Sequence, residues 1–168
     1  MISEFLNTIR KNHAIEHATI GLLLDEGKLK GPVAGYATPL GYFVIGRVNS
    51  NDLDEAAKTA IIRLQNGETH LAVSPFCGTN LLVAATLASI SVIIATRGKS
   101  PIQKLPAAIS STLLGLVVSQ PIGRLIQQYL TTKAKIGNSG VKSVNSLGNV
   151  HFIRTTKISY ERLTEPCK

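Results

Sequence analysis

Two long runs without a charged residue constrain this chain more than any other feature. They cover residues 76–96 and 105–123, and neither contains Lys, Arg, Asp or Glu. A helix over the first run would be about 31 Å long, close to the hydrocarbon thickness of a bilayer. Charged side chains flank the runs at Arg97, Lys104 and Arg124, as expected where a charge in hydrocarbon costs a few kcal/mol. The pattern predicts two transmembrane helices.

Small residues recur every fourth position in both runs. They are Ser111, Gly115, Ser119 and Gly123 in the second run, and Ala84 and Ala88 in the first. Such rows let helix backbones approach closely in lipid. The connection over residues 97–104 is short, so it fits an antiparallel hairpin. A pair of buried core helices in a soluble protein is the alternative, but a chain of 168 residues has little material to cover two helices that are apolar on all sides.

The formal charge of +8 is unevenly distributed. Residues 1–78 carry seven basic and eight acidic side chains, so the positive excess follows the start of the first apolar run. Anionic lipid is the expected partner of this basic half, and nucleic acid is not, because basic residues interleaved with aromatic ones are missing. The N-terminal residues resemble no cleavable signal peptide. We therefore expect a cell-membrane protein with two transmembrane helices and both termini in the cytoplasm.

The polar segments predict a small mixed domain. Apolar spacing favours a helix over residues 3–25, with a stripe formed by Leu6, Ile9, His13, His17, Ile20 and Leu24. A β-rich run follows at residues 42–48, and a second helix is expected over 52–66, capped by Ser50 or Asn51.

The remaining polar segments lie close to the hairpin in sequence. Residues 69–74 are predicted as a short strand, 137–148 as a Ser/Gly/Asn-rich linker, and 150–158 as a strand that rejoins the N-terminal sheet. The expected fold class is α+β with an inserted transmembrane helical hairpin. Its expected parts are an N-terminal α+β part at 1–75, the hairpin at 76–128, and a basic linker and strand at 129–168.

One motif could carry chemistry, the H-x-x-E-H of His13, Glu16 and His17. Histidines four residues apart on a helix lie on one face, at a span that one metal ion can bridge. The motif resembles that of the inverzincin metallopeptidases, in which both histidines bind zinc and the glutamate is the base. That resemblance implies these roles for His13, His17 and Glu16.

A metal site needs a third protein ligand. The candidates are Glu68 and His70, and more remotely His151. Cys77, at the start of the first apolar run, could be a ligand, a reactive thiol or a buried small residue. Without a metal, the motif would form a buried polar network, since buried imidazoles must be paired.

Two longer motifs extend the comparison. The sequences HAIEHATI at 13–20 and LQNGETHLAVSPFCGTN at 64–80, followed by two apolar runs, resemble a family of small bacterial membrane proteins known as a domain of unknown function. The resemblance implies a two-helix integral membrane protein, and it suggests that the H-x-x-E-H, Gly67-Glu68 and CGTN blocks belong to one site.

Two hypotheses about function follow. The first is an integral membrane protein with a His/Glu site for a divalent metal, zinc in particular, that acts as a peptidase-like hydrolase. The second is a non-catalytic membrane scaffold or accessory subunit, in which the buried His and Glu residues form a structural network. The expected partners of the protein are the lipid bilayer and another membrane protein or a second copy of the chain.

Overall fold

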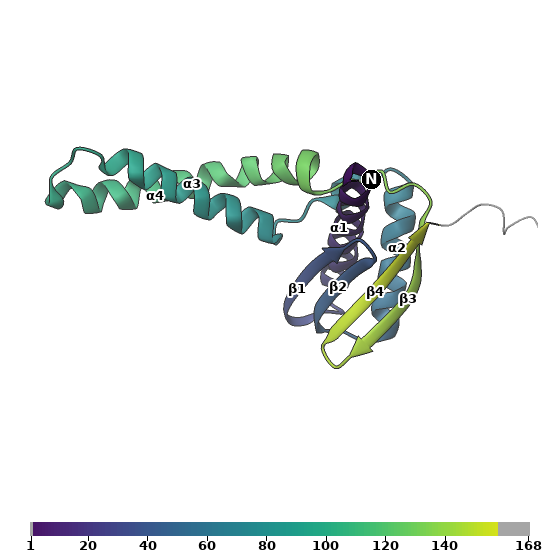
Figure 1. Ribbon diagram of the computed structural model, residues 1–168. Coiled ribbons are helices and arrows are strands. Elements are labelled where there is room, and N and C mark those ends of the chain that lie inside the picture. Colours follow the sequence, from purple (N-terminus) through teal and green to yellow (C-terminus); the bar gives the residue numbers. More distant parts are fainter. Residues whose placement is uncertain (1, 158–168) are drawn as a thin grey trace, which may run out of the picture. The chain divides into compact units, whose positions relative to one another are not determined.

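The computed structural model describes residues 2–157 and divides into two compact units (Figure 1). The first unit is discontinuous in sequence, because residues 2–73 combine with residues 132–157. The second unit is formed by residues 74–131, between those two segments. The fold class is α+β, as predicted, with four α-helices and one four-stranded antiparallel sheet in the described part of the chain.

Two helices of the first unit lie on one face of its sheet. Helix α1 spans Ile2–Asp25 and helix α2 spans Ser50–Gln65, which confirms both predicted helices (Figure 1). The middle of α1 is buried over nearly its whole circumference, because it packs against both the sheet and α2. The predicted stripe is correct only in its central part: Leu6 and Leu24 at its ends are exposed, whereas His17 and Ile20 are buried.

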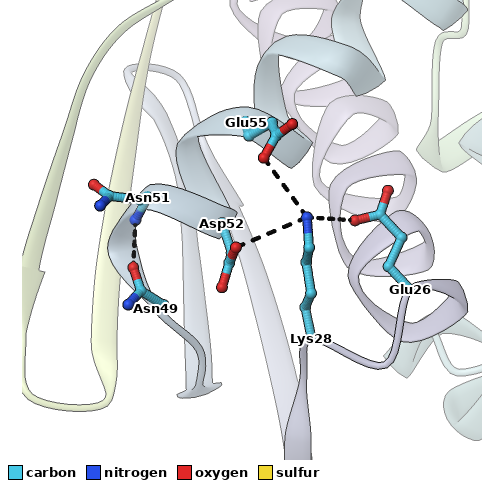
Figure 2. Close-up of polar contacts among 6 residues, drawn as sticks. All are labelled: Glu26, Lys28, Asn49, Asn51, Asp52 and Glu55. Atoms are coloured by element: carbon cyan, nitrogen blue, oxygen red, sulfur yellow. Dashed lines mark hydrogen bonds and ion pairs between the residues drawn. The ribbon is translucent and has the colours of Figure 1, made fainter.

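Helix α2 begins with a side-chain cap and an ion cluster (Figure 2). Asn49, one residue before the predicted cap, accepts a hydrogen bond from the backbone N–H of Asn51 at 2.8 Å. Lys28 follows α1, and its Nζ lies 2.8 Å from a carboxylate oxygen of Glu26. Carboxylates of Asp52 and Glu55 lie 3.8 and 3.6 Å from the same Nζ. These contacts connect the end of α1 with the first two turns of α2.

The sheet has the order β1-β2-β4-β3, with all neighbours antiparallel. Its strands are β1 (Lys30–Thr38), β2 (Gly41–Arg47), β3 (Ser139–Leu147) and β4 (Val150–Lys157). The prediction that the C-terminal strand rejoins the N-terminal sheet is confirmed, since β4 pairs with β2. Tyr42, Val44 and Ile153 point from the central strands into the core beneath the helices.

Two of the local predictions are wrong. The predicted linker over residues 137–148 is largely strand β3, because its small polar residues pair with β4 across a two-residue turn. Gly148 stands at the first position of that turn with a φ of 60°, where Gly is favoured. The predicted strand at 69–74 is instead the short 3₁₀ helix η1, Thr69–Ala72.

The second unit is a helical hairpin. Helix α3 spans Gly78–Thr96, and helix α4 spans Pro101–Ile126, followed by the π-helical turn η2 at Gln127–Thr131. The α4 residues that are buried are Gly115, Ser119 and Gly123, three members of the predicted small-residue row. A Cβ on Gly115 would lie 2.9 Å from the Ala88 Cα, so the two backbones are in close contact there. By length and apolar composition, both helices could cross a membrane.

Polar side chains join the two chain segments at the end of the hairpin where the polypeptide enters and leaves. The Gln127 Oε1 accepts the backbone N–H of Ser74 at 2.9 Å, while its Nε2 donates to the carbonyl of Ser74 and to Asn80 Oδ1. Asn80 in turn donates to the carbonyls of Ser74 and Pro75. Helix α3 is capped by Cys77, because the Cys77 Sγ accepts from the backbone N–H of Thr79.

Candidate metal site

The H-x-x-E-H motif lies in the middle of α1. His13 and His17 occupy adjacent turns on one side of the helix, and their ring centroids are 4.3 Å apart with an interplanar angle of 62°. His17 is only 4% exposed, and His13 is half-buried. The expectation that the motif faces the interior is therefore confirmed for His17.

The surroundings of His17 fix which of its nitrogens carries the proton. Nδ1 lies 2.8 Å from the carbonyl oxygen of Ala72 in η1. A carbonyl can only accept, so Nδ1 must be the N–H donor. In the neutral imidazole, Nε2 then carries a lone pair. That Nε2 is buried and has no hydrogen-bond partner within the described residues.

This arrangement is the one that metal-ligating histidines adopt. Such a residue donates its second ring N–H to a carbonyl or carboxylate, which fixes the ring and makes the other nitrogen a better ligand. A buried nitrogen that lacks a partner otherwise costs about 1–3 kcal/mol. The contact between His17 and Ala72 therefore leaves the lone pair of Nε2 available to a cation.

Glu16 contacts the sheet. Its side chain packs against Gly35 in β1, where a Cβ would overlap the Glu16 carboxylate. Glu16 is 5% exposed, and its charge contributes to the raised pKa of Tyr42, whose main cause is burial. Gly35 is therefore needed for close approach of the Glu16 carboxylate to the strand.

The predicted third ligands from the end of α2 lie in different environments. Glu68 forms an ion pair with Arg63, and the hydrogen bond from that guanidinium lowers the pKa of the Glu68 carboxyl. Glu68 is thus held as a carboxylate that already has a cationic partner. His70 is exposed on η1. Neither residue belongs to a group of three potential ligands within the described part of the chain.

His151 is buried on the inner face of β4, with both ring nitrogens engaged. Nδ1 lies 2.7 Å from Ser146 Oγ, and Nε2 lies 3.3 Å from the carbonyl of Gly46. The Gly46 carbonyl must accept from Nε2, so Nδ1 accepts from the Ser146 hydroxyl. This pattern is that of a satisfied core histidine and contrasts with His17.

Cys77 adds a sulfur donor to the candidates. His13, His17 and Cys77 offer two imidazole nitrogens and one thiol, a donor set that could hold a metal ion. The covalent chain connects Cys77 to the carbonyl that orients His17, since only four residues lie between Cys77 and Ala72. Nitrogen and thiolate ligands together suit zinc and similar transition metals.

Two contributions to this site were not accessible from sequence patterns. The Ala72 carbonyl is a backbone group, so no residue type signals it. Gly35 lies in a segment whose Gly and Pro content indicates turns, and only the packing of α1 on β1 gives it a role. The i, i+4 histidine spacing was the sequence signal for the candidate site.

The α+β unit, the apolar hairpin and the His/His/Cys donor set define a small protein with a candidate metal group and two helices of membrane-spanning length. Its family follows from comparison of sequences: residues 8–144 match the domain of unknown function DUF6391, and the chain belongs to that family. It is also 32% identical to an uncharacterized protein of Picosynechococcus sp. over 164 residues, which cover 87% of this chain and 78% of the relative. No solved structure matches the chain.

Proposed function

We propose that this protein is an integral membrane protein that holds a divalent transition-metal ion, zinc in the first instance, at His13 and His17. The observation that carries the proposal is the state of His17, with Nδ1 bonded to Ala72 and Nε2 buried without a partner among the described residues. The half-buried imidazole of His13, with its centroid 4.3 Å away, supplies the second nitrogen. One cation bound by both rings would satisfy Nε2 and use the i, i+4 spacing.

Cys77 is the proposed third ligand. Five residues of extended chain span at most about 18 Å, which limits how far Cys77 can lie from the Ala72 carbonyl that fixes His17. A thiolate adds the negative charge that two neutral imidazoles lack, and it strengthens the preference for zinc over magnesium or calcium. Glu68 and His70 stay predicted third ligands. Metal content of variants of Cys77, Glu68 and His70 distinguishes which of the three residues binds the metal.

Helices α3 and α4 are the proposed membrane anchor. Their supporting features are the apolar surfaces, the length of each helix and the absence of acidic residues throughout 74–131. Most of their large apolar side chains are exposed in the hairpin. Such surfaces are favourable in lipid and costly in water.

Metal content of the full chain purified in detergent tests the site. We expect about one zinc per chain, and a loss of roughly tenfold or more in affinity for His13→Ala, His17→Ala and Cys77→Ser. His70→Ala is the matched control, because this exposed histidine is predicted to leave the metal content unchanged. A chain without metal would contradict the proposal and favour the scaffold hypothesis, with His13, Glu16 and His17 as a structural network.

A hydrolase is the second candidate function. Three protein ligands leave a coordination position for water, which is the arrangement of catalytic zinc sites. Glu16, one residue before His17, is the candidate base. Hydrolysis of fluorescent casein in detergent that is abolished by chelator and by Glu16→Gln, with zinc retained in the variant, would support catalysis. Hydrolysis that is unchanged in Glu16→Gln would contradict a base role, while the metal site would stand.

A further inference from the structure

A groove within the helical hairpin has Cys77 in its lining, and its other lining residues take no part in the proposed metal site. It has a volume of about 570 Å³ and lies between the first turns of α3 and the last turns of α4. All of the lining residues belong to the second unit.

The groove is polar at one end and apolar at the other. Leu116, Gln120 and Arg124 follow one another at four-residue spacing along α4 and form one wall. Arg124 lies at the open end of the hairpin, where the chain enters and leaves. Leu116 lies two turns deeper, together with Ala84 of α3. The walls therefore change from cationic to apolar over a short distance along the helices.

Small residues create the recess. Ser119 is 4% exposed and its hydroxyl donates to the Leu116 carbonyl at 2.7 Å, so its polarity is satisfied within α4. Ala84 opposite has only a methyl group. The amide of Asn80 is also satisfied, by Ser74, Pro75 and Gln127. These internal bonds leave the Arg124 guanidinium as the cationic group of the groove.

No carboxylate of the hairpin can neutralise Arg124. The sequence contains no Asp or Glu between Thr69 and Tyr160, so all of residues 74–131 lack acidic side chains. An exposed guanidinium beside an apolar recess, in a segment without acidic residues, is complementary to an anionic amphiphile.

We propose that this groove binds a phospholipid with an anionic headgroup, with the phosphoryl group at Arg124 and Gln120 and an acyl chain along Leu81, Ala84 and Leu116. Arginine suits the headgroup because its planar fork makes two parallel hydrogen bonds to phosphate oxygens. The apolar wall accepts methylene groups, which a free phosphate lacks. The inference rests on the membrane-spanning role proposed for the hairpin, and it does not depend on the metal site.

The test is native mass spectrometry of the full chain in detergent micelles, with phosphatidylglycerol and phosphatidylcholine offered at equal concentration. We expect one retained phosphatidylglycerol per chain. Arg124→Gln should reduce its retention about tenfold, since a hydrogen bond to a charged group contributes about 1.4 kcal/mol or more. Arg97→Gln, the same charge change at the far end of α3, is the matched control and should leave retention nearly unchanged.

Two further measurements distinguish a specific lipid site from general attraction to basic residues and from a site for the phosphate group alone. Ala84→Leu fills the recess without changing charge, so it should also lower retention, whereas general attraction to basic residues would not respond. Free glycerol 3-phosphate should not displace the lipid. Equal loss in Arg124→Gln and Arg97→Gln, unchanged retention in Arg124→Gln or Ala84→Leu, or displacement by glycerol 3-phosphate would overturn the inference. A chain that is monodisperse without amphiphile would instead overturn the membrane role itself.

Discussion

At the residue scale, His17 illustrates how a backbone group decides the chemistry of a side chain. The i, i+4 spacing from His13 was sufficient to predict that the two imidazoles share a helix face. The tautomer of the neutral His17 imidazole depends on the Ala72 carbonyl, 55 residues away in sequence. Tertiary contacts of this kind have no local signature, so the sequence could predict the pair of histidines and not the orientation of the ring.

Gly35 is predicted to be sensitive to a single methyl group. In Gly35→Ala, the new Cβ would overlap the Glu16 carboxylate, and we expect the free energy of unfolding to fall by about 1–3 kcal/mol. Glu16→Ala should largely rescue this loss in the double variant because it removes the overlapping group. Chemical unfolding of the four variants in detergent measures the coupling. Additive effects would show that Gly35 and Glu16 do not interact.

Because of Tyr42, the free energy of unfolding is predicted to fall as the pH becomes alkaline. Burial raises the pKa of its hydroxyl above the usual 10.0, while the hydroxyl pairs with Thr19 Oγ1 at 2.8 Å. The unfolded chain would ionise Tyr42 near pH 10 and the folded chain would not. The stabilisation is therefore present below that pH and is lost as pH rises above it.

The corresponding variant is Tyr42→Phe. We expect a loss of about 0.5–1.5 kcal/mol at pH 7, because Thr19 keeps its bond to the Ile15 carbonyl. Between pH 9 and 11, its stability should fall less steeply than that of the parent chain, as measured by thermal unfolding. Parallel pH profiles would exclude Tyr42 as a source of the alkaline loss.

At the scale of elements, the hairpin and the central strands β2 and β4 were largely predictable, whereas the edge strands β1 and β3 were not. Four-residue spacing of small side chains identified the α4 face that contacts α3, because close backbone approach requires small residues wherever it occurs. Strand β3 consists mainly of small polar residues, and its conformation depends on pairing with β4. Gly148-Asn149, between Leu147 and Val150, was the local signal for that β-hairpin.

Gly115 is predicted to be the position of the hairpin most sensitive to size. In Gly115→Leu, the side chain would enter space occupied by the backbone of Ala88 and Leu87 and force α3 and α4 apart. We expect a loss of about 1–3 kcal/mol, read as a lower melting temperature in detergent. Gly78→Ala is the control, since nothing lies within 4 Å of its Cβ position. Equal sensitivity at both glycines would contradict the packing described for the hairpin.

At the scale of the whole molecule, the chain combines an α+β unit built from two sequence segments with a hairpin formed by the residues between them. The prediction that depends on this combination is a requirement for an amphiphile. Size-exclusion chromatography should give a monodisperse peak in detergent and aggregation when the detergent is removed, because the apolar surfaces of α3 and α4 would then face water. A monodisperse chain in plain buffer would contradict membrane insertion.

The proposed metal site is measured most directly by X-ray absorption spectroscopy at the zinc edge on the full chain in detergent. We expect one zinc with two nitrogen ligands at about 2.0–2.1 Å and one sulfur ligand at about 2.3 Å. The sulfur should disappear in Cys77→Ser, and His17→Ala should lose a nitrogen ligand or the metal altogether. A purified chain without bound metal, or with zinc surrounded by oxygen ligands alone, would contradict a metal site at His13 and His17.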